Sequence, residues 1–282
     1  MDFNHSVYKL KDFYRKLTVP QFTIVTGLIV IFLGTLVLST PFCSSQNVGL
    51  WEAFFTSTSA ITVTGLTVID IGSDLTIFGQ IILAFMLLSG GLGLMAITTF
   101  LQGFVVKGAK LRTRLDKGKT LDEFGVGGIG RTFQSIAITA ASIISLGAFI
   151  LYFFGFININ NPWERLWVSI FHSISAYNNA GFSIWNTSIY EYRTNFVVNF
   201  VFIVLIVLGG LGWRVIDDIW THRNNLRYKK LTLHSKLVIR TTLNLILFGS
   251  IGFLITESLL NGQFFSDLNF FERILSALFE TI

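Results

Sequence analysis

Two short apolar stretches, each ending in a polar turn that contains a glycine, hold the residue types that could do chemistry. The first, 56–66, reads TSTSAITVTGL, and the second, 171–182, reads FHSISAYNNAGF. Threonine and asparagine side chains and backbone carbonyl groups are neutral ligands, and glycine allows backbone geometry that other residues resist. Dipoles of this kind can replace the water shell of a cation. They suit a monovalent ion better than a divalent one.

The two stretches are copies of one unit. A shift of 116 residues aligns six identical pairs within 15 positions: Trp51 with Trp167, Phe55 with Phe171, Ser57 with Ser173, Ser59 with Ser175, Ala60 with Ala176, and Gly65 with Gly181. Such agreement predicts an internal duplication. Further along, 90–93 and 209–212 both read GGLG, for which we expect a helix-packing role for the small residues.

A third copy begins near the end of the chain. A shift of 108 residues aligns four more pairs: Asn161 with Asn269, Glu164 with Glu272, Arg165 with Arg273, and Phe171 with Phe279. The next turn glycine would fall at position 289, beyond Ile282. We therefore expect the third copy to be incomplete and the chain to be a truncated form.

Helices must hold these turns in place. Long windows without charge predict five membrane-spanning helices, at 21–38, 76–101, 132–156, 195–219 and 237–259. The segment 50–60 would be about 16 Å long as a helix, too short for a hydrocarbon core of about 30 Å, so it must re-enter or lie flat. Asn161, Pro162 and Glu164 carry the signal of a helix start for the second short helix. An inward-dipping helix directs a C-terminal end of about −0.5 charge at the membrane centre, which favours cations.

Composition and charge agree with a membrane protein. The 282 residues are 52% hydrophobic and 13% charged, with a mean hydropathy of +0.64, which excludes soluble and disordered classes. Of 21 basic residues, 18 lie on the side of the N-terminus, which we therefore place in the cytoplasm. The outer side holds three basic and nine acidic residues. The single cysteine, Cys43, excludes a disulfide framework.

The chain is thus predicted to be an all-α membrane protein of repeated units, each a spanning helix, a short re-entrant helix with its loop, and a second spanning helix. The expected order is a cytoplasmic segment (1–19), a first unit (20–102), a cytoplasmic linker (103–131), a second unit (132–221), a second linker (222–236) and an incomplete third unit (237–282).

The quoted stretches 56–66 and 171–182 strongly resemble the first two pore loops of the Trk/Ktr/HKT potassium transporters. Because the first spanning helix leads directly into the first loop, the chain looks most like the Ktr-type membrane subunit. The resemblance implies a potassium-channel-like architecture of four units, of which the third is cut here. It also implies uptake of K⁺, often dependent on Na⁺, across the plasma membrane.

The same resemblance implies partners and site residues. Members form dimers gated by a cytoplasmic nucleotide-binding ring of the RCK/KTN type, and no covalent cofactor is expected. Gly65 and Gly181 match the selectivity glycines of the family. Its carbonyl-ligand role, carried over to this chain, falls on Thr62, Val63, Thr64, Asn178, Asn179 and Ala180.

Other functions remain open at this stage. A nonconducting remnant or a membrane scaffold is one alternative, and a membrane-embedded enzyme is another, although no intramembrane cluster of acid, base, metal ligand or nucleophile supports catalysis. Anionic lipid explains the basic inner side without nucleic acid.

Three further motifs receive structural interpretations. Gly125, Gly127 and Gly130 fit a dinucleotide-binding pattern but lack a preceding strand, so we expect a mobile surface loop. His172 is expected to be a helix-packing or interfacial residue, and Asp217 and Asp218 to form a solvated salt-bridging cluster.

Overall fold

The computed structural model describes residues 19–46, 48–91, 126–222, 231–259 and 268–282. Every regular element in these ranges is a helix, apart from an isolated bridge that pairs Ser44 with Leu75. The chain divides into two compact units, one of 1–69 with 73–139 and the other of 70–72 with 140–282. Each unit is described by itself below.

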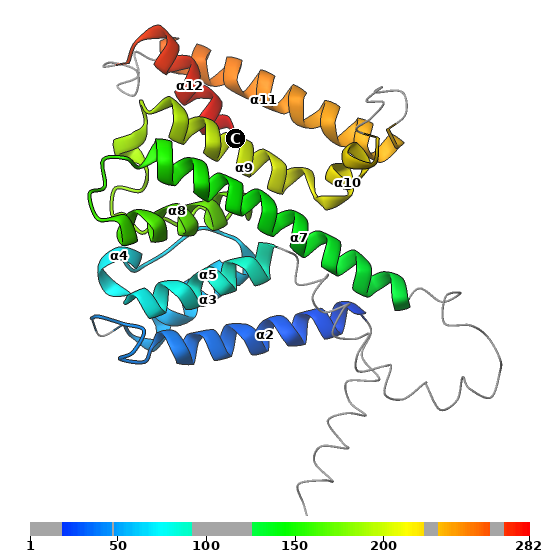
Figure 1. Cartoon of the computed structure of the whole chain (residues 1–282). Coiled ribbons are helices and arrows are strands. Elements are labelled where there is room, and N and C mark those ends of the chain that lie inside the picture. The colour runs from blue at the N-terminus through cyan, green and yellow to red at the C-terminus, as the bar shows by residue number, and fades with distance from the viewer. Residues whose placement is uncertain (1–18, 47, 92–125, 223–230, 260–267) are drawn as a thin grey trace, which may run out of the picture. The chain divides into compact units, whose positions relative to one another are not determined.

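The first unit places a short helix between two longer ones. Helix α3 (Leu50–Thr62) packs against α2 (Val19–Leu38) and α5 (Ile77–Gly91), as Figure 1 shows in blue and cyan. The connection after α2 is tied to the start of α5, because the Thr76 amide donates to the Cys43 carbonyl at 2.9 Å. The predicted span at 76–101 is thus helical up to Gly91, and its remainder lies outside the described residues.

The second unit contains the other helix that precedes a glycine turn, α8 (Pro162–Tyr177; Figure 1). Its elements are the later part of α7 (Val126–Ile150), a π-helical turn η2 (Leu151–Gly155), α8, a 3₁₀ turn η3 (Tyr190–Tyr192), α9 (Phe196–Leu211), α10 (Trp213–Thr221), α11 (Leu233–Leu259) and α12 (Phe270–Thr281). Helix α8 packs against η2 and α9, while α12 packs against α9 and α11. The four-residue helix α4 (Ile71–Asp74) lies where the chain passes between the units.

The predicted start of the second short helix is confirmed. The Asn161 side chain accepts a hydrogen bond from the Trp163 amide at 3.1 Å, and Pro162 takes the first helical position. Helix α12 begins with the related signal, since the Asn269 amide donates to the Glu272 carboxylate at 2.8 Å. Capping of otherwise unpaired amides explains why these helices begin where they do.

Removing this cap should cost measurable stability. We expect Asn161→Ala to lower the free energy of unfolding by about 1 kcal/mol, because one amide of the first turn loses its acceptor. Thermal unfolding in detergent measures this change, with the exposed Asn158→Ala as the matched control. Equal stability of the two variants would show that the cap contributes nothing.

The prediction of a single spanning helix at 195–219 is wrong. Helix α9 ends at Leu211 and α10 begins at Trp213, with an angle of 95° between them. Gly212 lies between them with φ 78° and ψ 150°, a conformation that side-chain-bearing residues avoid. The sequence did not reveal this break, because the charge-free stretch continues to Trp213 and a hydropathy window does not register backbone geometry.

The expectation of a mobile loop at the glycine pattern is also wrong for the part of the pattern that the structure describes. Residues 126–130, which include Gly127 and Gly130, form the first turns of α7, whereas Gly125 lies outside the described residues. Isolated glycines cost a helix about 1 kcal/mol each, which a helix of 25 residues can absorb.

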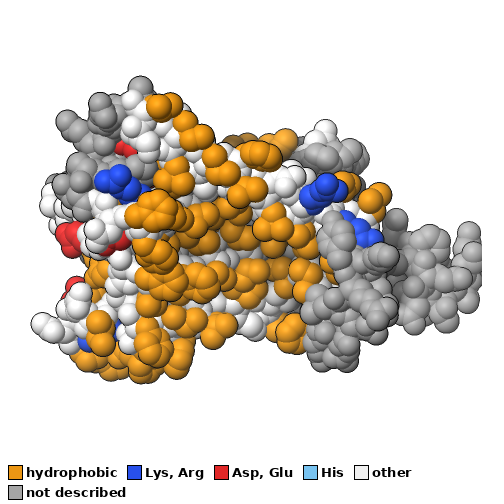
Figure 2. Space-filling view, turned by 90° about the horizontal axis from the view of Figure 1, so that it is seen from above, with side chains coloured by type: hydrophobic (Ala, Val, Ile, Leu, Met, Phe, Trp, Pro, Cys, Tyr) orange, Lys and Arg blue, Asp and Glu red, His pale blue; other side chains and the backbone are white. Residues whose placement is uncertain are grey.

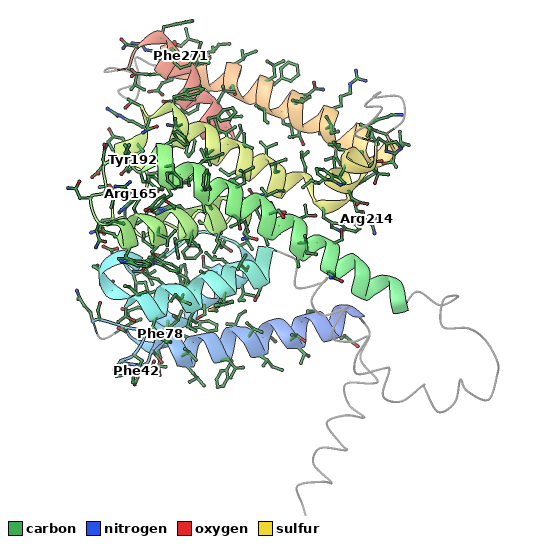
Figure 3. The ribbon with its side chains drawn as sticks, in the orientation of Figure 1. Phe42, Phe78, Arg165, Tyr192, Arg214 and Phe271 are labelled. Atoms are coloured by element: carbon green, nitrogen blue, oxygen red, sulfur yellow. The ribbon has the colours of Figure 1, made fainter. Side chains whose placement is uncertain are left out.

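Several helices have the composition of membrane spans. In the described ranges, Gln134–Gly155 and Leu233–Leu259 are long and apolar enough to cross a membrane. If the bent pair α9–α10 is counted as one span, it is the third, and it is the one that is bent. The described apolar parts of α2 and α5, Ile24–Leu38 and Ile77–Gly91, are shorter. Figure 2 shows many hydrophobic side chains on the visible surface of the described residues. Within the second unit, Arg165 and Tyr192 lie at one end and Arg214 at the other (Figure 3). This distribution is that of a helical membrane protein.

Candidate functional site

The first glycine turn follows directly from the end of α3. Val63 and Gly65 have left-handed backbone angles, with φ of 55° and 83° respectively. Between them, the Thr64 amide donates to the Ser59 carbonyl at 2.9 Å. A β-branched residue such as Val63 rarely adopts positive φ, so this turn is a strained segment of the kind that gathers at functional sites.

The second glycine turn has the same backbone course at the end of α8. Asn179 and Gly181 have φ of 54° and 70°, and the Ala180 amide between them donates to the Ser175 carbonyl at 2.9 Å. Each residue lies 116 positions after its counterpart in the first turn. The two stretches that are similar in sequence therefore form the same local structure.

Equivalent side chains close the last helical turn in both cases. The Thr62 hydroxyl donates to the Thr58 carbonyl at 2.8 Å, and the Asn178 amide donates to the Ile174 carbonyl at 2.7 Å. These side chains satisfy carbonyl groups of the helix end. They leave the carbonyl groups of the following turn residues as the candidate ligands. The Asn178 Oδ1 atom is buried and has no hydrogen-bond partner among the described residues.

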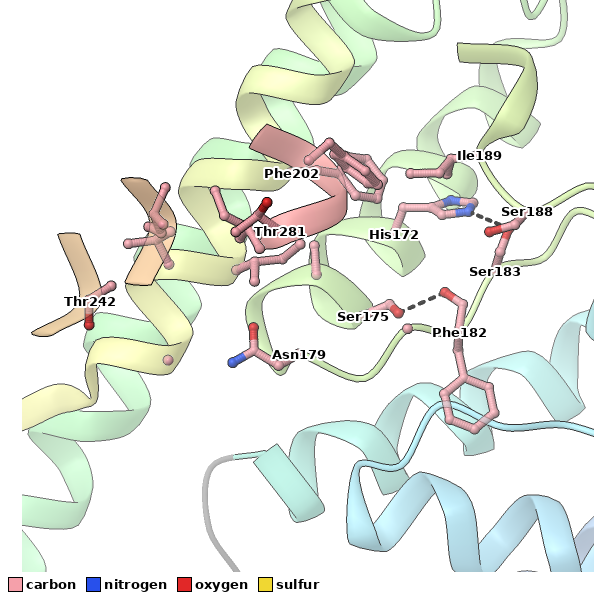
Figure 4. A pocket seen from close by; sticks show the side chains of 18 of the residues that line it. His172, Ser175, Asn179, Phe182, Ser183, Ser188, Ile189, Phe202, Thr242 and Thr281 are labelled. Carbon is pink, nitrogen blue, oxygen red and sulfur yellow. Dashed lines mark hydrogen bonds between the residues drawn. The ribbon is translucent and has the colours of Figure 1, made fainter. Parts of the chain in front are cut away.

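Two serines on the short helices, Ser59 and Ser175, form hydrogen bonds to the end of each turn. The Ser59 hydroxyl accepts from the Leu66 amide at 3.0 Å, and the Ser175 hydroxyl donates to the Phe182 carbonyl at 2.7 Å (Figure 4). Each therefore reaches the residue that follows the turn glycine. In the sequence, Ser59 and Ser175 stand out only as one of the identical pairs at a shift of 116 residues. That identity is the signal by which their role at the turns could be found.

A glycine of each GGLG sequence allows a helix to approach the end of a short helix closely. A methyl group added at Gly209 would lie 1.7 Å from the Tyr177 carbonyl oxygen, and one added at Gly90 would lie 2.4 Å from the Ile61 carbonyl oxygen. The predicted packing role is confirmed for these two glycines. Gly212, in contrast, forms the break after α9, and positions 92 and 93 lie outside the described residues.

The second turn borders a cavity of about 640 Å³ in the second unit. Figure 4 shows side chains around it from the turn and from α8, α9, α11 and α12. Its lining includes Asn179 and Gly181 from the turn, Phe202 and Gly210 from α9, Thr242 from α11 and Thr281 from α12. The lining is mostly apolar; its polar side chains carry hydroxyl, amide and imidazole groups, and among the described residues it includes no Asp or Glu side chain.

The predicted site residues differ in how far they are exposed to solvent. Asn179 and Gly181 are exposed in the cavity wall, whereas Asn178 and Ala180 are buried behind it. In the other unit, the predicted residues all lie in the turn after α3, where Thr62 and Thr64 are exposed and Val63 and Gly65 are half-buried. Thr242 of α11 and Thr281 of α12 carry no motif by which the sequence could have identified them, whereas Gly210 of α9 belongs to a GGLG sequence for which only helix packing was expected.

The remaining polar groups serve structural contacts. Asp218 accepts from the Thr232 amide and hydroxyl at 2.9 Å each, and its other oxygen lies 3.2 Å from His222 Nδ1. The expected salt-bridging cluster of Asp217 and Asp218 is thus found only in part, as the contact of Asp218 with His222, which is an ion pair when the imidazole is protonated. Among the described residues, no three His, Cys, Asp or Glu side chains come together as a metal site would require.

Apolar helices of spanning composition, together with neutral carbonyl-rich turns at two helix C-terminal ends, define a helical membrane protein suited to handling cations. The comparison with known families then identifies the group. Residues 9–280 match the TrkH family, described as cation transport proteins, and the chain belongs to that family.

Individual relatives agree with this assignment. The chain is 33% identical over 233 residues to the Ktr system potassium uptake protein B of Bacillus subtilis, covering 82% of this chain and 51% of that protein. It is 30% identical over 239 residues to the protein of the same name from Vibrio alginolyticus, covering 84% and 52%. It is 32% identical over 276 residues to the potassium/sodium uptake protein NtpJ of Enterococcus hirae, covering 97% and 60%. The chain spans about half the length of the curated relatives it matches.

Proposed function

We propose that this chain takes part in K⁺ uptake across the cell membrane, through a pathway in which the two glycine turns form part of the selectivity filter. The observation that carries the proposal is the shared geometry of the two turns. Each turn comes directly after the C-terminal end of a short helix, α3 or α8. Such an end carries partial negative charge, and the turn adds carbonyl oxygens that can replace water around a cation.

The proposed ligands are the backbone carbonyl groups of both turns. In the first turn these belong to Thr62, Val63, Thr64 and Gly65, and in the second to Asn178, Asn179, Ala180 and Gly181. The Thr62 hydroxyl and the Asn178 amide nitrogen donate to their own helices, and the Asn178 Oδ1 atom is buried, which supports coordination by the backbone. Because no Asp or Glu side chain of the described residues lines the adjoining cavity, the site suits a monovalent ion better than a divalent one.

The orientation of the chain in the membrane, its partners and its dependence on Na⁺ are proposed from its membership of the family. We place the turns toward the outside of the cell, the N-terminus in the cytoplasm and the spanning helices in lipid, in agreement with the basic inner segments. A second copy of the chain and a cytoplasmic nucleotide-binding ring are the proposed partners, as the resemblance to the Ktr-type subunit implies. Two relatives are named as proteins of a Ktr system, which supports a system of several components. Dependence on Na⁺ is proposed as well, because a third relative is named for both ions.

Ion uptake by purified protein in liposomes tests the function. We expect accumulation of radioactive Rb⁺ to be suppressed by external K⁺ at concentrations at least about tenfold lower than those needed for choline or Li⁺, because a fixed ring of dipoles discriminates by ion size. Liposomes without protein provide the control, and addition of Na⁺ tests coupling. Rb⁺ uptake no faster than in protein-free liposomes, for the 282 residues and for a four-repeat chain that contains them, would refute the proposal.

A further inference from the structure

A buried histidine lies directly behind the second turn. His172, on α8, is 0% exposed, and its two ring nitrogens both have partners. Nδ1 lies 2.9 Å from the Val168 carbonyl oxygen, and Nε2 lies 3.1 Å from the hydroxyl of Ser183 (Figure 4). Ser183 follows Gly181 by two residues, so the imidazole connects the short helix to the segment that leaves the turn.

The partners determine which nitrogen carries the proton. A carbonyl oxygen can only accept, so Nδ1 must donate to Val168 and the neutral ring presents Nε2 as an acceptor. The Ser183 hydroxyl then donates to Nε2, and its oxygen accepts from the Trp185 amide at 3.1 Å. In this series of three hydrogen bonds each donor has one acceptor, so the Ser183 hydroxyl is the donor and His172 Nε2 the acceptor.

Aromatic rings hold the imidazole in this orientation. Trp185 stacks on His172 with ring centroids 4.4 Å apart, and Tyr192 stacks on the far side of Trp185 at 5.2 Å. Phe156 and Phe171 meet the imidazole edge-on at 5.9 Å each. The ring therefore has little freedom to rotate away from Ser183.

The first turn lacks this connection. Thr56 occupies the position 116 residues before His172, and its buried hydroxyl has no partner among the described residues. Thr67 occupies the position of Ser183 and donates instead to the Ile69 carbonyl of its own loop. The histidine contact is thus specific to the second turn, although the two turns share their backbone course.

We propose that His172 is a positioning residue, whose Nε2 contact with Ser183 fixes the position of Gly181 and its neighbours for ion coordination. This inference rests on the proposed function, because it assigns a role within the filter. Ser175 fastens Phe182 on the helix side, and His172 fastens Ser183 one residue later. Together they hold the end of the turn at two successive residues.

Substitutions that spare the packing test this role by ion selectivity. We expect His172→Phe and Ser183→Ala each to reduce the preference for K⁺ over Na⁺ about fivefold, as loss of one hydrogen bond would. The double variant should lose no more than either single variant. His172→Gln should recover most of the preference, because its amide oxygen can replace Nε2 as the acceptor. Thr56→Val, which removes the unpartnered hydroxyl in the first unit, is the matched control and should leave the preference unchanged.

A spectroscopic measurement supports the flux assay independently. The chain has four histidines, His5, His172, His222 and His234, so ¹⁵N-histidine labelling gives an assignable spectrum. We expect one ring, absent in His172→Gln, to carry its proton on Nδ1, and its Nε2 signal to shift in Ser183→Ala.

The outcomes separate the two claims. If both variants keep the wild-type preference while Gly181→Ser loses it, the histidine inference is wrong and the proposed function stands. If Gly181→Ser also keeps it, the proposed filter itself is wrong. Where His172→Phe does not fold, Ser183→Ala decides. A proton on Nε2 rather than Nδ1 overturns the inference even in a protein without flux.

Discussion

Gly181→Ser is expected to abolish most of the preference for K⁺ over Na⁺, with a loss of at least about tenfold, or about 1.4 kcal/mol. Gly181 has φ of 70°, and a side chain in that region costs about 1–2 kcal/mol. The turn relieves this cost by moving its carbonyl groups, which changes the distances that distinguish the two ions. Gly65→Ser should act in the same direction, since Gly65 has φ of 83°.

Competition of K⁺ and Na⁺ against Rb⁺ uptake measures the effect. Gly252→Ser is the matched control, because Gly252 lies in α11 with open space where a side chain would start. Unchanged selectivity in both Gly65→Ser and Gly181→Ser, with uptake retained, would remove the turns from the filter.

Gly209→Ala is expected to destabilise the second unit severely, by about 3 kcal/mol or more. The added methyl group would meet the backbone oxygen of Tyr177 at 1.7 Å, and neither helix backbone can yield as a side chain would. Because Tyr177 is the last residue of α8, any displacement also moves the turn that follows it. We therefore expect loss of K⁺ selectivity together with a lower melting temperature.

The adjacent glycine provides the control for this second variant. A methyl group at Gly210 would lie 3.3 Å from the Asn179 side-chain nitrogen, which can move aside, so Gly210→Ala should remain close to wild type in melting temperature. Thermal unfolding of both variants in detergent makes the comparison. Similar melting temperatures for the two would contradict the close contact of α9 with the end of α8.

Local signals in the sequence predicted the short helices well. The start of α8 followed from Asn161 and Pro162, and the turn after it was indicated by Gly181, whose conformation few other residues adopt. Each of these features depends on residues close together in sequence. The resemblance to a potassium transporter family rested on the same stretches, and membership of the TrkH family confirms it.

Features that depend on tertiary packing could not be predicted in this way. The break at Gly212 is hidden because the charge-free stretch that ends before Arg214 runs across it, and the helical start of α7 is hidden because its glycines suggest a loop. The enclosure of His172 requires Phe156, Trp185 and Tyr192, which approach it only after folding. The cavity beside Asn179 is formed by α8, α9, α11 and α12, and the residues of α11 that line it carry no recognisable site motif.

Crystals of a preparation that transports Rb⁺, grown in a rubidium salt, would test the central claim most directly by anomalous diffraction. We expect rubidium density beside the carbonyl groups of residues 62–65 and 178–181, at distances typical of direct coordination. Well-ordered turns without such density, in crystals that hold Rb⁺ at another place along the membrane, would contradict the account.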